Sequence, residues 1–249
     1  MIGGPGDSSD LGAAWVFTVS SGVWTQHGGK LTVSGSDEAG GAQFGAGVAL
    51  SSDGQTALIG GPFDASGPDN NAGAAWVFTG SGGGLTQQGS KLTPGDSVSF
   101  ATFGAAVALS ADGNTALIGG PDDDGFVGAA WTFTRSAGVW AQQGSKLTGA
   151  GESSLAEFGS SVALSSAGTT AVIGSPDDDG LGATWRFTGS PGTMTQDGSK
   201  LTPTGEIGSA GSGRAVAVSA DGDTALTGGP FDDNRSGGAW VFTRRPQAA

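Results

Sequence analysis

The stretch Ala13-Ala14-Trp15-Val16-Phe17-Thr18 recurs five times, with few changes, along a chain of 249 residues. Its tryptophans are Trp15, Trp76, Trp131, Trp185 and Trp240. Successive tryptophans are 61, 55, 54 and 55 residues apart. A regular period of this length is typical of an array of similar supersecondary units. The repeat therefore indicates the architecture before any single residue is interpreted.

One repeat reads as four short strands separated by turn signals. The segments expected to form strands are Phe103–Ser110, Thr115–Gly120, Ala129–Thr134 and the region from Val139 to Thr148. Asp112-Gly113 suits a tight hairpin, and Pro121 stops the second strand. Four strands per repeat are typical of a propeller blade, whose two faces are both buried by stacking. The sequence predicts an all-β protein, a β-propeller of about five four-stranded blades.

The two ends of the array do not match each other. The chain opens on a strand stub, Ile2-Gly3-Gly4, and stops after a third strand near Arg244. We expect one propeller domain over residues 1–249, with an inner strand missing from the first blade and an outer strand missing from the last. The approximate repeat units are 1–43, 44–102, 103–157, 158–211 and 212–249.

Incomplete blades allow three arrangements of the chain. The five units can close into a ring, exchange strands with another copy, or form part of a longer propeller. Unpaired strand edges readily pair with other chains, which supports strand exchange between copies and hence a homo-oligomer. A closed or nearly closed ring of five units is the arrangement we favour from the sequence.

The motifs within each repeat resemble a known family. Phe-Gly followed by small residues and Val-Ala-Leu-Ser, then Asp-Gly, Ala-Leu-Ile-Gly-Gly-Pro and Gly-Ala-Ala-Trp-Val-Phe, is similar to the FG-GAP repeat of integrin α-subunit propellers. The resemblance covers almost the whole chain and implies an extracellular propeller used for adhesion or ligand binding. Integrin-type repeats often carry a calcium loop, Asp-x-Asp-x-Asp-Gly, after the first strand. The turns here hold one carboxylate or none, as in Ser52-Asp53-Gly54 and Ser166-Ala167-Gly168, too few for Ca²⁺. The chain therefore resembles a bacterial-type variant that lacks these calcium sites.

Composition narrows the classes of partner. The net charge of −13 disfavours nucleic acid and anionic membranes, which would repel the surface. There is no Cys, no run of 18 apolar residues and no secretion signal at Met1. From the resemblance we nevertheless expect a secreted or cell-surface location.

Acidic residues gather in the loops expected on one face of the propeller. Two of these loops contain three consecutive aspartates, namely Asp122, Asp123, Asp124 and Asp177, Asp178, Asp179. An Asp after Pro commonly stabilises a turn through its own backbone, and this is the interpretation we favour. The alternative is a divalent cation site, possible for Ca²⁺ if the carboxylates converge.

Differences between repeats mark candidate ligand-binding residues, because the shared residues are explained by the fold. Arg214 replaces a small residue on an expected inner strand, where it could bind an anion or simply pair with a nearby Asp. Aromatic and acidic candidates at the loop face are Phe63, Phe126, Phe231, Asp122, Asp177 and Asp232. The recurring lysines Lys30, Lys91, Lys146 and Lys200 are expected to pack their stems and expose their charged ends.

The sequence contains few of the residues and motifs that enzymes use for catalysis. It has no Cys or Tyr, one His in an expected outer strand, and no nucleophile or phosphate-loop motif. We expect a non-catalytic propeller that presents an acidic loop face to a protein or glycan. Two alternatives remain, namely a structural subunit that oligomerises through its open blades and a carboxylate-dependent hydrolase or lyase acting on a polysaccharide.

Overall fold

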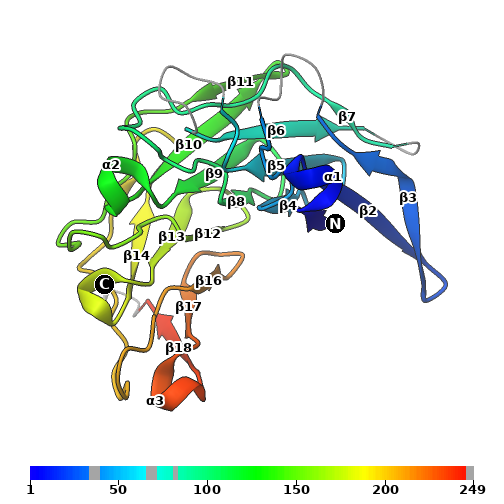
Figure 1. Cartoon of the computed structure of the whole chain (residues 1–249). Helices are drawn as coiled ribbons and strands as arrows, with labels where there is room; N and C mark the ends of the chain where they lie inside the picture. The colour runs from blue at the N-terminus through cyan, green and yellow to red at the C-terminus, as the bar shows by residue number, and fades with distance from the viewer. Residues whose placement is uncertain (34–39, 66–71, 81–83, 245–249) are drawn as a thin grey trace.

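The computed structural model describes residues 1–33, 40–65, 72–80 and 84–244. Five antiparallel sheets follow one another along the chain and form an open arc (Figure 1). In the described residues the sheets have three, four, four, four and three strands, and chain neighbours pair within each sheet. The predicted all-β propeller architecture with incomplete first and last blades is confirmed.

The strands occupy equivalent segments of each repeat. The first sheet contains β1 (Ile2–Gly4), β2 (Ala13–Ser20) and β3 (Val23–Leu31). The second contains β4 (Val48–Leu50), β5 (Thr56–Gly61), β6 (Ala74–Thr79) and β7 (Thr86–Gln87). The third contains β8 (Ala106–Leu109), β9 (Thr115–Gly120), β10 (Ala129–Ser136) and β11 (Val139–Gln142). The fourth contains β12 (Ser161–Leu164), β13 (Thr170–Ser175), β14 (Ala183–Thr188) and β15 (Thr195–Gln196). The last contains β16 (Ala215–Val218), β17 (Thr224–Gly229) and β18 (Gly238–Thr243).

Short helical turns follow Pro5, Pro121, Pro176 and Pro230 in four of the repeats. They are α1 (Asp7–Asp10), α2 (Asp123–Phe126), η2 (Asp178–Gly180) and α3 (Asp232–Arg235). Each contains residues at positive φ, including Asp124 at 52° and Asp179 at 50°. No helix within the described ranges has the length and apolar character needed to span a bilayer.

Each sheet has two different faces, which we call the back face and the front face. In the second sheet, Ile59, Trp76 and Phe78 share the back face, which packs against the first sheet, while Leu58 and Val77 share the front face. The front face packs against the back face of the third sheet, where Leu58 contacts the cluster around Trp131. The core is therefore a series of front-to-back contacts and not a single central cluster.

An edge-to-face aromatic pair lies at each of the three complete back faces. Phe44 meets Trp76 at 5.5 Å between ring centroids, Phe103 meets Trp131 at 5.4 Å, and Phe158 meets Trp185 at 5.4 Å. Offset and edge-to-face rings are the favoured aromatic geometries. The recurrence of the Trp in every repeat is thus explained by packing.

Glycine in the second strand of each repeat allows neighbouring sheets to approach closely. A Cβ atom on Gly60 would lie 1.9 Å from the Gly104 carbonyl oxygen, and one on Gly119 would lie 2.0 Å from that of Gly159. Real Cβ atoms do not come so near to backbone, so only glycine fits. The Gly-Gly-Pro motif is therefore a blade-contact motif.

The turn between the first two strands of a blade is closed by its own side chains. In the third sheet, the Ser110 hydroxyl donates to Asp112 Oδ1 at 2.5 Å and accepts from the Thr115 amide at 2.9 Å. Asp112 also accepts from the Asn114 amide at 3.0 Å. These hydrogen bonds lower the pKa of Asp112, chiefly the one from Ser110. The single carboxylate of this turn thus stabilises a hairpin.

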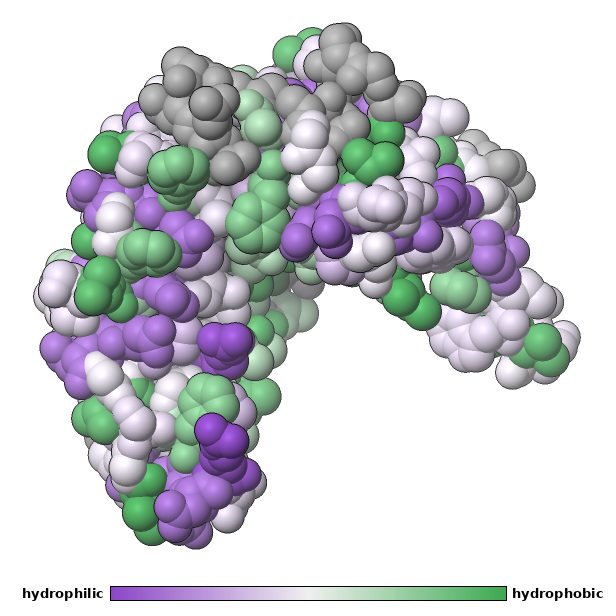
Figure 2. All heavy atoms as spheres, in the orientation of Figure 1, coloured by the Kyte–Doolittle hydropathy of each residue, from purple (hydrophilic) through white to green (hydrophobic). Residues whose placement is uncertain are grey.

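The ring favoured from the sequence does not form, because the first and last sheets lie at opposite ends of the arc (Figure 1). The same packing recurs at the interior interfaces, so the angle between neighbouring sheets is set by that packing. Four such steps do not return the last sheet to the first. The inside of the arc is an open hollow in the space-filling view (Figure 2).

Candidate functional site

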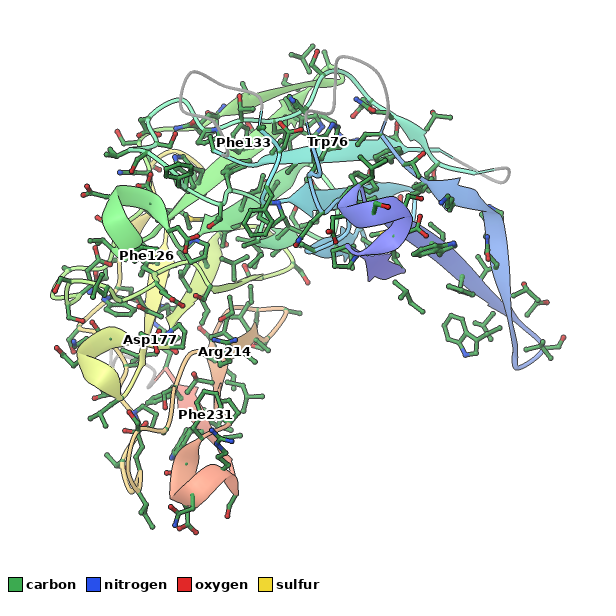
Figure 3. The ribbon with its side chains drawn as sticks, in the orientation of Figure 1. Trp76, Phe126, Phe133, Asp177, Arg214 and Phe231 are labelled. Carbon is green, nitrogen blue, oxygen red and sulfur yellow. The ribbon has the colours of Figure 1, made fainter. Side chains whose placement is uncertain are left out.

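The candidate site lies on the face of the arc where the helical turns meet the loops that join consecutive blades. Backbone amides of these loops donate to aspartates of the helical turns. The Val98 amide donates to Asp123 Oδ1 at 2.6 Å, and the Ser153 amide donates to Asp178 Oδ1 at 2.7 Å. The two sets of acidic loops are therefore held together as one loop face, from which Phe126, Asp177 and Phe231 project (Figure 3).

The second aspartate of each triplet is a structural residue. Asp123 Oδ2 lies 2.5 Å from Lys146 Nζ, and Asp178 Oδ2 lies 2.5 Å from Lys200 Nζ. Both carboxylates are buried, whereas the two lysine side chains are about one fifth exposed. The lysine ends are thus paired inside the loop face, not free in solvent as the sequence suggested.

The geometry does not support a cation site at the aspartate triplets. Among the residues that the structure describes, no three acidic or histidine side chains converge to hold a metal ion. Asp123 and Asp178 already have lysine partners, Asp179 Oδ2 lies 2.7 Å from Lys200 Nζ, and Asp124 points outward from an exposed turn. At these positions the positive charge that balances the aspartates therefore comes from lysine.

Asp232 belongs with Asp123 and Asp178, and not with Asp122 and Asp177 as the sequence grouping suggested. Its Oδ1 accepts from the Ile207 amide at 2.6 Å, which repeats the loop contact of the other two. Asp232 consequently ties the loop around Ile207 to the helical turn α3.

A pocket between the second and third repeats gathers the aromatic and acidic candidates. Its volume is about 250 Å³, and its lining includes Phe63, Phe100, Thr102, Asp122 and Phe126. All three phenylalanines are exposed, at 42%, 54% and 49% respectively, although single exposed apolar residues are unremarkable. Their gathering around one carboxylate is the informative feature, and we call this site the Phe–Asp pocket.

Phe100 was missed by the sequence analysis, although it lies in a loop between blades that recurs in the next repeat, where Leu155 takes its place. The available signal was the sequence Val98-Ser99-Phe100, which has an aromatic ring where the next repeat, Ser153-Ser154-Leu155, has leucine. Phe231 does not join this pocket. It lines a separate hollow of about 400 Å³ with Ile207 and Arg235, at the other end of the loop face.

The carboxylates around the pocket are poorly compensated. Desolvation by burial raises the pKa of Asp122, and a hydrogen bond with Thr102 opposes this only in part. Burial also raises the pKa of Glu157, and the nearby charges of Asp177 and then Asp122 raise it further. The structure thus brings Asp122 and Asp177 together around Glu157.

Arg214 stands close to this acidic group. Its side chain is exposed just before β16, on the inner curve of the arc (Figure 3). Its positive charge lowers the pKa of Glu157, but less than burial, Asp177 and Asp122 raise it. Arg214 therefore partly neutralises an acidic group, and the geometry does not favour it as an isolated anion site.

A further carboxylate with a raised pKa lies at the next loop. Burial, followed by the charge of Asp178, raises the pKa of Glu152 to about 7, although a backbone hydrogen bond from Gly149 opposes the shift. The Gly149 amide donates to Glu152 Oε2 at 3.0 Å. Along this face several carboxylates thus hold protons more tightly than in water.

Another hollow of about 340 Å³ lies between the first two sheets at their opposite end. His27 and Asp53 line it, but the Asp53 carboxylate already accepts from the Ser51 hydroxyl at 2.6 Å and from the Gln55 amide at 2.9 Å. This hollow therefore offers fewer free polar groups than the Phe–Asp pocket.

The sequence profile of the FG-GAP repeat family matches residues 24–78 and 86–133, which confirms the resemblance over these two stretches. No curated protein matches the chain. Among solved structures, hydrazine synthase from Kuenenia stuttgartiensis aligns with a TM-score of 0.42 and 14% identity over 74% of this chain and 41% of that chain. A structure described as TolB from Agrobacterium tumefaciens aligns with a TM-score of 0.45 and 14% identity over 79% of this chain and 57% of that chain. The chain thus spans less than two thirds of the length of either structure.

Proposed function

Because this chain carries FG-GAP repeats folded as propeller blades, we propose that it is a non-catalytic, extracellular binding module that acts through its acidic loop face. The Phe–Asp pocket is the observation that carries the proposal. It combines exposed rings with a partly desolvated carboxylate, in a molecule whose net charge is −13.

This combination favours a cationic ligand group. Aromatic faces attract ammonium and guanidinium ions, most strongly where water is displaced. A carboxylate whose pKa is raised by burial, as that of Asp122 is, is stabilised in its charged form when a cation arrives. A lysine or arginine side chain of a protein ligand satisfies both features, so a basic protein surface is the proposed partner.

The negative charge on the rest of the loop face also favours a basic protein partner. Glu157 and Asp177 lie beside Asp122, and Arg214 offsets them only in part. A basic ligand would be attracted over distance by this field, mainly through its association rate at low salt. A neutral glycan would gain ring stacking at the pocket but nothing from the charge.

Amide and methyl NMR spectra during titration test the proposal. The probes are the capped amino acids N-acetyl-arginine amide and N-acetyl-trimethyllysine amide, with N-acetyl-norleucine amide as the neutral analogue and cellobiose as the glycan. We expect shifts around Phe63, Phe100 and Phe126 with the cationic probes alone. Phe126→Ala and Asp122→Asn should abolish those shifts.

Two matched variants serve as controls. Phe231→Ala removes an equally exposed ring outside the pocket, and Asp124→Asn removes an exposed carboxylate two residues from Asp122. Both should leave the titration unchanged. Shifts with cellobiose and none with the cations would replace the basic ligand by a glycan, and no shifts with any probe would exclude the pocket as the binding site.

A further inference from the structure

The last sheet presents an apolar front face against which none of the described residues of another sheet packs. Leu226 and Val241 are paired on this face and are 41% and 63% exposed. In the three interior sheets the residues equivalent to Leu226, namely Leu58, Leu117 and Val172, are fully buried. Around them, Ala215, Gly228 and Ala239 line a shallow depression of about 560 Å³.

The space beside the second-strand glycine also shows that the front face of the last sheet is uncovered. A Cβ on Gly60, Gly119 or Gly174 would meet the next repeat's backbone at 1.9–2.1 Å. A Cβ on the equivalent Gly228 would meet nothing closer than 3.8 Å, and its neighbours there belong to its own sheet. The front face of the last sheet is thus built for a further blade.

The first sheet presents the opposite, back face, and in the described part of the chain no other sheet packs against it. Ile2 pairs with Trp15 on this face, and Ile2 is 58% exposed while Trp15 and Phe17 are half-buried. The equivalent interior residues are buried, as Ile59, Trp76 and Phe78 show for the second sheet. The two ends of the arc therefore carry the two halves of one interior interface.

We propose that the front face of the last sheet in one copy docks onto the back face of the first sheet in a second copy. A second copy fits this face because the contact would continue the interior interfaces. At those interfaces a front-face Leu packs against a back-face Ile and Trp of the next sheet. Leu226 and Val241 would take the places of Leu58 and Val77, and Ile2 and Trp15 those of Ile118 and Trp131.

The geometry makes this contact intermolecular. The two faces lie at opposite ends of the arc (Figure 1), so one copy cannot join its own ends. A contact between two different surfaces is heterologous and produces chains, or larger rings where the rotation closes. Because each copy carries a charge of −13, added salt should strengthen the association by screening repulsion.

Light scattering at increasing protein concentration tests the proposal with two charge variants. Val241→Glu blocks the front face and Ile2→Glu blocks the back face, and both positions are more than half exposed, so both variants should fold. Wild type should exceed the 24.0 kDa monomer mass as concentration rises. Each variant should remain monomeric, with apparent affinity weakened roughly ten-fold or more.

Mixing the two variants gives the sharpest readout. The Ile2→Glu copy keeps a good front face and the Val241→Glu copy keeps a good back face. An equimolar mixture should therefore form one capped heterodimer, about twice the monomer mass, which no symmetric interface would give. Val139→Glu, at an exposed valine on an outer strand, is the control and should associate as wild type does.

Three results would overturn the proposal. They are a wild-type chain that stays monomeric at all concentrations and salt levels, variants that associate as wild type does, and a mixture that stays monomeric. The proposal stands apart from the proposed binding function, because none of these substitutions touches the Phe–Asp pocket.

Discussion

The interior interfaces and the end faces of this arc are built from the same residue types, yet they differ completely in burial. At interior interfaces a front-face Leu and a back-face Ile–Trp pair exclude water, with Leu58, Ile118 and Trp131 fully buried. At the ends, Leu226 and Ile2 are exposed at 41% and 58%. A repeat therefore does not determine its own burial, because the neighbouring repeat supplies half of each interface.

The largest expected effect is the difference in stability lost when an interior tryptophan and a tryptophan of an end sheet are each replaced by alanine. Trp131→Ala removes a buried ring that meets Phe103 edge-to-face and donates through Nε1 to Asp96 at 2.8 Å. We expect a loss of about 3–5 kcal/mol in the free energy of unfolding. Trp15→Ala should cost less than half as much, since Trp15 is only partly buried and its back face is not covered by another described sheet.

Urea denaturation followed by circular dichroism measures both losses. The comparison should be made at low protein concentration, where association through the end faces is weak. Equal losses for the two variants would show that Trp15 is covered in solution, and the distinction between interior and end faces would then fail.

The second comparison concerns the buried aspartates of the loop face. Asp123→Asn leaves the Lys146 ammonium without its partner, and we expect a loss of about 2–3 kcal/mol, moderated because Lys146 is partly exposed. Asp232→Asn in the last repeat removes no lysine contact, so its cost should be about 1 kcal/mol.

Thermal and urea unfolding of the two aspartate variants measure this difference. A double variant Asp123→Asn/Lys146→Met supplies the control, since removing both charges should recover part of the loss. A loss for Asp232→Asn as large as that for Asp123→Asn would mean that Asp232 finds a cation elsewhere.

Much of this fold follows from the sequence, and particular residues show where the inference ends. The Trp15 hexapeptide and the Gly-Gly-Pro motif indicate strands, blades and their incomplete ends, because local pattern and turn chemistry suffice for those. The open arc is not encoded in any one repeat. It depends on the angle at which packed sheets meet, which no local pattern reports.

Some residues of the candidate site could likewise be predicted from the sequence, and others could not. Phe63, Phe126 and Asp122 differ between repeats and were identifiable for that reason, whereas Phe100 required knowledge of how a variable loop folds back. The pairing of Asp123 with Lys146 was present as a signal, since an Asp and a Lys recur together in four repeats. Repetition alone did not distinguish an ion pair from a solvated lysine.

A smaller effect is expected at the interface between the fourth and last sheets, where polar residues replace apolar ones. Thr227 takes the place of Ile173, and its hydroxyl oxygen lies 2.9 Å from that of Thr184 in a buried hydrogen bond. Thr227→Ile alone should cost about 1–2 kcal/mol, because it leaves the Thr184 hydroxyl buried without a partner.

The double variant Thr184→Ala/Thr227→Ile restores the pattern of the interior interfaces and should be at least as stable as wild type. A double-mutant cycle in urea measures the coupling, which should be well above the additivity error of a few tenths of a kcal/mol. Additive effects would show that the two hydroxyls act independently, and that this interface tolerates polar groups by hydration.

The last effect is a pH dependence that belongs to an interior loop. Burial raises the pKa of Glu152 to about 7 from an ordinary value of 4.5, so the folded state binds its proton more tightly than the unfolded state. The resulting stabilisation is fully present below pH 4.5 and is lost as the pH rises through about 7. The free energy of unfolding of the wild type should therefore fall between pH 5 and 8. Glu152→Gln, which stays neutral, should flatten this dependence on pH. Asp233→Asn, in the exposed turn of the last repeat, should leave the dependence unchanged. Urea midpoints across this pH range measure the slope, and an equally steep slope in Glu152→Gln would place the titrating group elsewhere, with Glu157 as the next carboxyl whose pKa burial raises.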